Sequence, residues 1–329
     1  MKVAITGGAG YVGSHALIEL KRAGHQPIVV DNLSEGHAQA VGDCPLIRVD
    51  LADEDAVCEV LSRNRVEAVM HFAASAYVGE SVVAPEKYYL NNVVNTLKLL
   101  RAMRKTGVQR IVFSSSCSVY GAPKSTPITE DFALSPINPY GRTKATVEGI
   151  LEDYGHAYGL RYASLRYFNA AGAMPDGSLG EDHKPETHLI PLVIRAALGL
   201  EKCVRIYGTD YPTPDGTCVR DYVHVLDLGT AHVMALGALD KHSPRIYNLG
   251  TGRGYSVKEV IEAVKRVSNR DVPVREERRR PGDPPALVGS PQKINTELGW
   301  QPRFASLQDI IETAWRWHST HPSGFASCG

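Results

Sequence analysis

The first half of the chain alternates short apolar runs with amphipathic stretches, and this alternation restricts the possible folds more than any other feature. The apolar runs fall at residues 3–5, 28–30, 46–49, 68–72, 111–113 and 162–165. Helical patterns lie between them, for example at 14–22, 55–62, 87–105 and 143–158. Short β-rich runs separated by helices are typical of parallel sheets, and strands that are apolar throughout indicate a sheet covered on both faces. We therefore predict an α/β fold with a Rossmann-type, doubly wound parallel sheet.

The composition and hydrophobic pattern of the chain change near residue 169, where Pro and Gly become frequent and the predicted elements become shorter. Helical patterns continue at 189–200, 226–239, 257–267 and 307–317. This favours a smaller α/β lobe packed over the carboxyl ends of the strands, where α/β folds bind ligands. We predict a dinucleotide-binding domain at 1–168 and a mainly substrate-binding lobe at 169–329, with elements of the two interleaved.

Charge and cysteine usage exclude several classes of protein. The 329-residue chain has 36 basic and 36 acidic residues, so no bulk field points to nucleic acid or to a membrane surface. No apolar run reaches membrane-spanning length. The cysteines are scattered, which argues against a disulfide framework and a zinc site and fits a reducing cytosol. We expect a cytoplasmic protein without a metal site. The cysteines are Cys44, Cys58, Cys117, Cys203, Cys218 and Cys328.

A glycine-rich turn follows the first apolar run and precedes the first helical pattern. Gly7, Gly10 and Gly13 form G-x-x-G-x-x-G. Backbone without Cβ lets a pyrophosphate approach, and the amino end of the helix supplies free N–H groups and positive potential. Asp31 ends the second run, where a carboxylate can accept both ribose hydroxyls of NAD and repel the extra phosphate of NADP. The alternative for Asp31 is a turn residue.

Further cofactor positions are expected at the ends of the next strands. Asp50 ends the third run, where its carboxylate could accept a hydrogen bond from the adenine amino group. Phe72, Ala73 and Ala74 end the fourth run and leave room for the cofactor. His71, just before them, is expected to be a packed histidine rather than a catalyst. NAD is therefore the predicted cofactor.

Tyr140 and Lys144 lie one helical turn apart behind Pro139, where a helix can begin. A free phenol has a pKa of about 10 and is a poor base, but an ammonium on the same helix face favours the phenolate. The pair can serve as an acid/base for a sugar or alcohol hydroxyl. Ser116 closes the fifth run, so its hydroxyl can reach the same oxygen. This spacing also arises by chance, and a Ser triplet after a strand can be only a turn and cap.

Together these motifs resemble the extended short-chain dehydrogenase/reductases over nearly the whole chain. In that family the Tyr is the acid/base, the Lys lowers its pKa and holds the nicotinamide ribose, and the Ser aligns the reacting hydroxyl. Further motifs resemble the members that invert C4 of a UDP-hexose by transient oxidation to a 4-keto sugar. These motifs lie at 78–81, 88–92, 166–169, 207–212, 215–222 and 280–283.

The resemblance also implies a set of contacts for each ligand. In it, two arginines meet the sugar diphosphate, which suits the bidentate match of guanidinium to phosphate. On the NAD side it adds Tyr11, Val12, Asn32, Ser34, Gly36, Leu51, Asn91, Ser114 and Phe168 to the residues above. On the UDP-hexose side it implies Ser116, Tyr140, Asn169, His188, Leu189, Arg205, Tyr207, Arg220, Arg280, Asp283 and Leu287.

Two positions depart from the family pattern. Ser75-Ala76 stand where some members have a Lys near the cofactor phosphates, so NAD retention has to depend on other contacts. Leu287 stands where members restricted to glucose and galactose have a Tyr, and its smaller side chain predicts that UDP-GlcNAc and UDP-GalNAc are also substrates. His188 could equally be a surface or capping residue. Cys117 has no base paired with it in sequence and is not expected to be a nucleophile.

Other functions remain as alternatives. A nucleotide-sugar 4,6-dehydratase or decarboxylase of the same family needs extra acid/base groups, but Ser116 is followed by Cys-Ser-Val without a carboxylate. A net dehydrogenase is not excluded by the core motifs. A catalytically silent NAD-binding regulator is disfavoured because Tyr140 and Lys144 are both present.

Two helical patterns with wide apolar faces predict a homodimer. These apolar faces could instead be buried entirely against the sheet of their own subunit. In members of the family, however, the two helices pair with those of a second subunit in a four-helix bundle. The apolar positions are Leu97, Leu100, Met103, Val147, Ile150, Leu151 and Tyr154.

Overall fold

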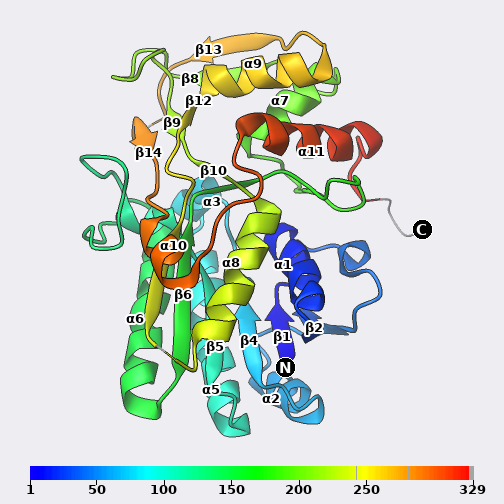
Figure 1. The fold of residues 1–329 in the computed structure, drawn as a ribbon, viewed down its shortest axis with the longest axis vertical. Helices are drawn as coiled ribbons and strands as arrows, with labels where there is room; N and C mark the ends of the chain where they lie inside the picture. Colours follow the sequence, from blue (N-terminus) through cyan, green and yellow to red (C-terminus); the bar gives the residue numbers. More distant parts are fainter. Residues whose placement is uncertain (242, 281, 326–329) are drawn as a thin grey trace.

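A seven-stranded parallel sheet forms the centre of the molecule (Figure 1). The computed structural model describes residues 1–241, 243–280 and 282–325. The strand order is β11-β6-β5-β4-β1-β2-β3. Successive strands are added on one side of β1 up to β3 and on its other side from β4 onward, as in a doubly wound sheet. The strands are β1 (Lys2–Thr6), β2 (Gln26–Asp31), β3 (Leu46–Arg48), β4 (Ala68–His71), β5 (Arg110–Ser116), β6 (Arg161–Tyr167) and β11 (Arg245–Leu249). The predicted fold class is confirmed.

Helices cover both faces of the sheet, which explains why its strands are apolar throughout. On one face α1 (Tyr11–Arg22) and α8 (Val225–Ala238) share a core with the sheet that contains Val3, Ile5 and Leu249. On the other face the core includes residues of α2 (Glu54–Arg63), α5 (Asn95–Thr106) and α6 (Pro139–Tyr158). Because α8 and β11 come from the C-terminal half of the chain, the two halves are interleaved in space.

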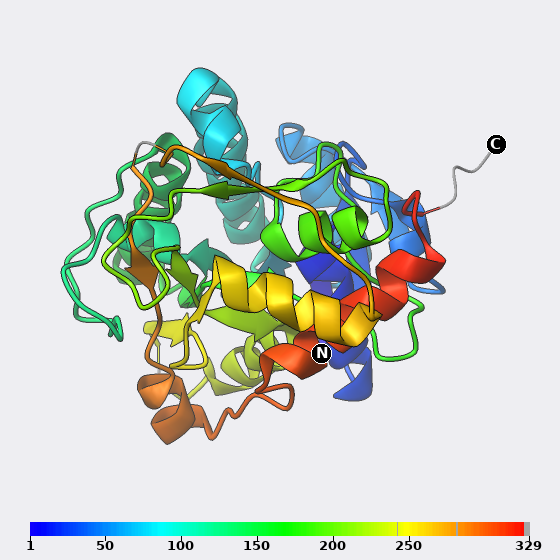
Figure 2. The same cartoon turned by 90° about the horizontal axis from the view of Figure 1, so that it is seen from above.

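A second lobe lies above the carboxyl ends of the strands (Figures 1 and 2). Its core is formed by α7 (Leu189–Ala197), α9 (Val257–Ser268) and α11 (Leu307–Thr320). Its strands are short and form small separate sheets. They are β7 (Asn169–Ala171), β8 (Val204–Tyr207), β9 (Val219–Arg220), β10 (Tyr222–His224), β12 (Tyr255–Ser256), β13 (Val274–Glu277) and β14 (Ala286–Leu287). The remaining α-helices are α3 (Val78–Val83), α4 (Pro85–Tyr88) and α10 (Gln292–Leu298).

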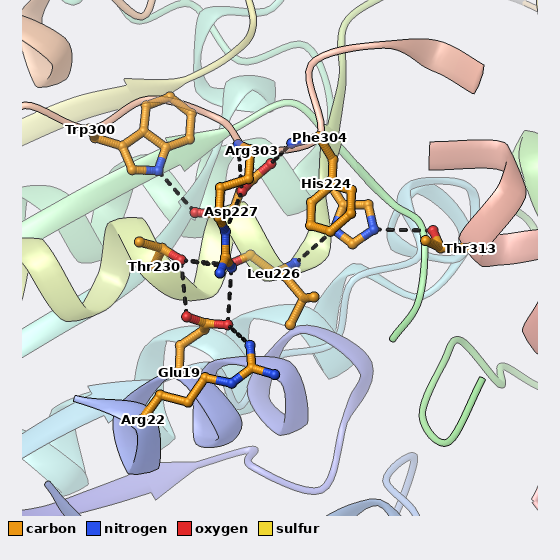
Figure 3. Close-up of polar contacts among 10 residues, drawn as sticks. All are labelled: Glu19, Arg22, His224, Leu226, Asp227, Thr230, Trp300, Arg303, Phe304 and Thr313. Carbon is orange, nitrogen blue, oxygen red and sulfur yellow. Dashed lines mark hydrogen bonds and ion pairs between the residues drawn. The ribbon is translucent and has the colours of Figure 1, made fainter. Parts of the chain in front are cut away.

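A polar network joins α1, α8 and the segment before α11 (Figure 3). Asp227 accepts hydrogen bonds from the backbone N–H groups of Arg303 and Phe304, each at 3.0 Å. Arg303 in turn donates to Glu19 on α1 at 3.0 Å. His224 accepts the N–H of Leu226 at 3.2 Å and stacks on Phe304 at 3.9 Å. The network therefore fixes the start of α8 against both the sheet domain and the C-terminal segment.

Most predicted elements are present, with boundaries shifted by a few residues. The predicted helix at 87–105 is interrupted, since residues 89–94 form a π-helical segment between α4 and α5. β11 was not predicted because its Arg-Ile-Tyr-Asn-Leu sequence lacks a continuous apolar run. Within the described part of the chain, no helix is both long and apolar enough to cross a membrane.

Candidate active site

The glycine turn has the geometry of an open anion cradle. Gly7 has φ +72°, and a Cβ there would lie 2.4 Å from the Ala73 nitrogen. A Cβ on Gly13 would lie 2.3 Å from the Gly7 oxygen, so both positions are restricted to glycine by close backbone packing. Gly10 caps α1 without a side-chain hydrogen bond, and a Cβ there would meet only Gly7 oxygen, at 3.4 Å. The first N–H groups of α1, at Tyr11 and Val12, thus face a space that suits a pyrophosphate.

Asp31 and its neighbours form the adjoining part of the predicted NAD site. The Asp31 carboxylate is buried and accepts the N–H of Ala9 at 2.9 Å and that of Leu33 at 2.8 Å. It therefore orders a turn, as in the alternative interpretation, while carboxylate lone pairs remain for ribose hydroxyls. Asp50 is exposed and accepts a hydrogen bond from the Asn32 amide at 2.8 Å.

The other predicted residues of the NAD side lie around this edge. Ser34 is exposed, Leu51 is buried, and a Cβ on Gly36 would lie 2.9 Å from Ala9. The N–H groups of Phe72 and Ala73 donate to the Thr6 oxygen at 2.8 and 3.0 Å, which places the end of β4 beside the glycine turn, and Ala74 follows. Asn91 lies in the π-helical segment and donates to Ser75 Oγ at 3.1 Å.

Ser116, Tyr140 and Lys144 meet at the carboxyl edge of the sheet. Ser116 is the last residue of β5, and α6 begins at Pro139 because Asn138 caps it by accepting the Gly141 N–H at 2.8 Å. Lys144 Nζ lies 5.8 Å from the centre of the Tyr140 ring and donates to the Ser114 oxygen at 2.7 Å. The structure thus brings the three predicted catalytic side chains together.

Burial dominates the acid–base properties of this pair. It raises the pKa of Tyr140 well above its usual value, and the nearby Tyr167 acts in the same direction, whereas a hydrogen bond with Ser116 opposes both. Burial also lowers the pKa of Lys144 to about 7, against the attraction of Glu148. Lys144 alone therefore does not make Tyr140 basic, and positive charge from a nicotinamide ring is needed beside it.

Two residues of this constellation were missed by sequence reasoning. Tyr167 pairs in register with Ser116, and its hydroxyl accepts a hydrogen bond from Ser114 Oγ at 3.0 Å. Glu148 is buried one turn beyond Lys144, where it accepts from Ser115 Oγ at 2.5 Å and from Arg166 Nε at 3.0 Å. The spacing of four residues from Lys144 was the available signal for Glu148. Cys117 beside them has its pKa raised to about 12 by burial, which disfavours a thiolate.

The second lobe brings two predicted arginines to one carboxylate. Arg280 Nε donates to Asp283 at 3.0 Å, and Arg220 Nη2 lies 3.8 Å from the other oxygen of Asp283. Arg280 also lies over the Tyr207 ring, 4.7 Å from its centre. Two guanidinium groups converging on one carboxylate define a position that an anionic group can share. Arg205 is exposed on the same strand as Tyr207.

Leu287 lies beside Arg220 and against the residues that follow Ser116. It pairs in register with Arg220 and packs against the apolar cluster that contains Cys117 and Phe168. Phe168 is buried, and a Cβ added to Gly289 would lie 2.2 Å from its ring. Asn169 follows, with its amide donating to the Asp221 oxygen at 3.0 Å.

His188 precedes α7 as its N-cap residue and Leu189 is the first residue of the helix, but their side chains have different surroundings. Leu189 is half-buried against the core of the second lobe. The His188 ring is 50 % exposed, and its Nδ1 lies 2.5 Å from Glu181 Oε1. Burial would lower the pKa of His188, but the charges of Glu181 and Glu186 raise it well above its usual value.

Comparison with known proteins identifies the family. The family model described as "NAD dependent epimerase/dehydratase family" matches residues 3–250. A UDP-glucose 4-epimerase of Halalkalibacterium halodurans is 47 % identical and covers 99 % of this chain and 98 % of its own.

Solved structures agree with this assignment. A crystal structure of a UDP-glucose 4-epimerase has a TM-score of 0.97 and 46 % identity, covering 99 % of this chain and 100 % of its own. The Bifidobacterium longum UDP-glucose 4-epimerase, solved with NAD⁺ and UDP, has a TM-score of 0.95 and 41 % identity, with 99 % and 100 % covered. The resemblance seen in the sequence motifs is confirmed, and the chain belongs to the NAD dependent epimerase/dehydratase family.

Proposed function

We propose that this protein inverts C4 of a UDP-hexose, such as UDP-glucose or UDP-galactose, by transient oxidation to a 4-keto sugar. One observation carries the proposal. Ser116, Tyr140 and Lys144 meet between a glycine turn open to a pyrophosphate and an arginine pair, Arg220 and Arg280, that converges on one position. Relatives at 46–47 % identity over nearly the whole chain are UDP-glucose 4-epimerases, which supports the same reaction.

NAD, when bound, supplies a reversible hydride acceptor for C4. The glycine turn would hold its pyrophosphate, and Asp31 would accept hydrogen bonds from its adenosine ribose. Tyr140 would remove the proton from the 4-hydroxyl during oxidation of C4 and return it when C4 is reduced on its opposite face. Ser116 aligns the same oxygen. Lys144, one turn away on α6, would add its positive charge to that of the nicotinamide ring, and together they would favour the phenolate.

Inversion requires the keto sugar to present its other face without leaving. Arg220 and Arg280 are placed to hold the diphosphate, far from the reacting carbon, so binding energy is concentrated on UDP. Asp283 and Tyr207 contact Arg280, and Asn169 donates to the backbone oxygen of Asp221, the residue after Arg220. A firmly held nucleotide and a loosely held pyranose ring permit the rotation.

The neighbouring reactions are less well supported by these residues. Elimination of the 6-hydroxyl, as in a 4,6-dehydratase, needs a further acid/base pair near Ser116. The side chains that follow it are Cys117 and Ser118, and burial raises the pKa of Cys117 to about 12. A net dehydrogenase would use the same core motifs, and the experiment below distinguishes it.

We infer a broader sugar range from Leu287. Its side chain is half-buried, pairs in register with Arg220 and packs against the cluster that contains Cys117. Because Leu is smaller than the Tyr of the restricted members, it would leave more room for a 2-acetamido group, so UDP-GlcNAc and UDP-GalNAc are expected to be interconverted as well. Absent turnover of UDP-GalNAc beside fast turnover of UDP-galactose would contradict this.

We also propose a homodimer formed through α5 and α6. Four of the seven apolar positions on these helices (Leu100, Met103, Val147 and Leu151) are buried in the chain's own core. This agrees, for these four, with the alternative that the helices are buried against the sheet alone. Leu97, Ile150 and Tyr154 are only half-buried, which leaves a narrower apolar strip to form the interface. A monomeric mass by light scattering at working concentration would refute the dimer.

A cytoplasmic location fits the five described cysteines, which are free, whereas Cys328 lies outside the described residues.

The deciding experiment uses purified protein without added cofactor. Equilibrium conversion of UDP-glucose and of UDP-GlcNAc is followed side by side by NMR. An epimerase carries its NAD through purification and reaches equilibrium catalytically. A net dehydrogenase instead converts no more than one substrate per bound NAD, and that stoichiometry would overturn the proposal.

A further inference from the structure

A compact cluster of two carboxylates and two imidazoles contains none of the three proposed catalytic residues, although its member His188 is also predicted on the UDP-hexose side. Glu181, His183, Glu186 and His188 all come from the segment that precedes α7. One ligand atom from each lies within 4.8 Å of every other. Glu181 Oε1 lies 3.0 Å from His183 Nδ1 and 2.5 Å from His188 Nδ1, and Glu186 oxygens lie 3.8 and 3.5 Å from the same two nitrogens.

We propose that these four side chains form a binding site for a divalent transition-metal ion, with Zn²⁺ as the best match. Nitrogen and oxygen ligands bind Zn²⁺ at about 2.0–2.2 Å in a tetrahedron, so neighbouring ligand atoms stand about 3.4 Å apart. The four Glu–His separations, 2.5 to 3.8 Å, bracket that value, and the ligand atoms of all four residues lie within 4.8 Å of one another. When an ion displaces the protons of the two imidazoles, the two carboxylates balance the charge of one divalent cation.

His183 faces the cluster without a well-formed hydrogen bond. Its Nδ1 atom is buried and forms an ion pair with Glu181 Oε1 at 3.0 Å, but this contact does not have the geometry of a hydrogen bond. A metal ion held between the two side chains would give both of them a better-matched partner. The half-exposed His188 provides the route by which an ion could enter.

The surrounding structure holds the cluster in place. Trp317 Nε1 donates to the Glu181 backbone oxygen at 2.9 Å, and the Phe325 N–H donates to Asp182 at 2.9 Å. The His183 ring meets the ring edges of Tyr11 and Tyr77 at 6.1 and 6.0 Å. Because Tyr11 belongs to the glycine turn, an ion in the cluster would tie the start of α7 to the NAD-binding turn.

This site has none of the cysteine pairs or short cysteine–histidine spacings that mark common zinc sites in a sequence. The spacing Glu-x-His-x-x-Glu-x-His contains no cysteine. The fold supplies what the spacing lacks, since it buries Glu181 to 3 % exposure and turns both imidazoles toward it.

The test is metal binding to tag-free holoenzyme that has been treated with EDTA. Calorimetric titration with ZnCl₂ is expected to give one ion per chain, and Co²⁺ is expected to give the visible ligand-field band of a four-coordinate site. His188→Gln, at a half-exposed position that the fold tolerates, should weaken Zn²⁺ binding by about 100-fold, as should His183→Gln. His156→Gln, in the last turn of α6, is the matched control and should bind as wild type does.

Two results would overturn the proposal. One is the absence of stoichiometric Zn²⁺ binding by the wild-type holoenzyme. The other is equal binding by wild type, His188→Gln and His156→Gln, which would mean adventitious surface binding. If His183→Gln fails to fold, as judged by circular dichroism, His188→Gln alone decides.

Discussion

The two ligand-binding regions of this protein are positioned by different forces. Around the glycine turn, site residues stand at the ends of long parallel strands whose apolar side chains are wholly buried, as in β1 and β5. In the second lobe the strands near Arg220 have only two residues each, and buried carboxylates hold the loops. Asp221, for example, accepts the N–H groups of Thr251, Gly252 and Gly289 at 2.9 to 3.2 Å. The ends of the parallel strands thus position the residues predicted to bind NAD. Hydrogen bonds to buried carboxylates position the loops that carry the residues predicted to bind the substrate.

The largest expected effect concerns chemistry at the edge of the sheet. Tyr140→Phe removes the only proposed acid/base for the 4-hydroxyl and should lower kcat by about 10³–10⁴-fold. Since the glycine turn is untouched, the protein should still carry NAD, measured by absorbance after purification. Tyr158→Phe changes an exposed tyrosine on the same helix and should leave kcat unchanged. Near-normal turnover of Tyr140→Phe would remove Tyr140 from the mechanism.

The difference between the regions also explains how far sequence reasoning reached. Asp31 and Ser116 end β2 and β5, as expected, because apolar runs fix where parallel strands end, and parallel strands end at one edge. The roles of these residues in binding and catalysis stay predictions. Their chemical setting was less accessible. The effect of Lys144 on the pKa of Tyr140 depends on burial, which raises that pKa in the structure and which spacing does not report.

In the second lobe, the site residues were predicted from family motifs and not from the hydrophobic pattern or the expected ends of strands. Arg220 and Arg280 were named from a family resemblance, yet their convergence on Asp283 depends on loops without periodicity. The Glu181 cluster was missed for the same reason, since burial rather than spacing brings its members together. Bonds from one side chain to distant backbone leave no periodic signal in the sequence.

The next largest effect tests whether polar bonds hold the second lobe. Asp221→Ala leaves several buried N–H groups without an acceptor, which should lower the free energy of unfolding by about 3 kcal/mol. UDP affinity should fall as well, because Arg220 precedes Asp221, whereas bound NAD should be retained. Urea unfolding and UDP titration measure both. Asp153→Ala, at an exposed position on α6, should change stability by less than about 0.5 kcal/mol. Equal stability of the two variants would refute the comparison.

A smaller effect tests the sheet region by pH. His71 in β4 is buried between Thr6 and Thr96, and burial, with the charge of Lys144, lowers its pKa to about 3. A histidine with a depressed folded-state pKa contributes stability above its unfolded pKa of about 6.5, and this stability is lost as the pH falls. Between pH 7 and pH 5 the loss from His71 should be about 2 kcal/mol. His71→Gln cannot protonate, so its stability difference from wild type should change by that amount.

Asp221 supplies the opposite sign and so a control within the same experiment. Burial raises its pKa to about 6, although hydrogen bonds from Thr251 oppose the rise. Its contribution is present below pH ~4 and is lost as the pH rises through about 6. Urea unfolding of Asp221→Asn at pH 4 and pH 7 should therefore show a difference from wild type that moves opposite to that of His71→Gln. Parallel pH profiles for the two variants would contradict both assignments.

The smallest expected effect asks whether the second lobe alone selects the sugar. Leu287→Tyr fills the space beside Arg220 and should lower kcat/KM for UDP-GlcNAc about tenfold more than for UDP-glucose, or about 1.4 kcal/mol of discrimination. Leu287→Met keeps the side-chain volume and should treat both substrates as wild type does. An equal loss for both sugars in Leu287→Tyr would mean that the residue supports the fold of β14 rather than the choice of substrate. A selective loss with bound NAD unchanged would instead separate the two regions completely, because one would set the chemistry and the other the specificity.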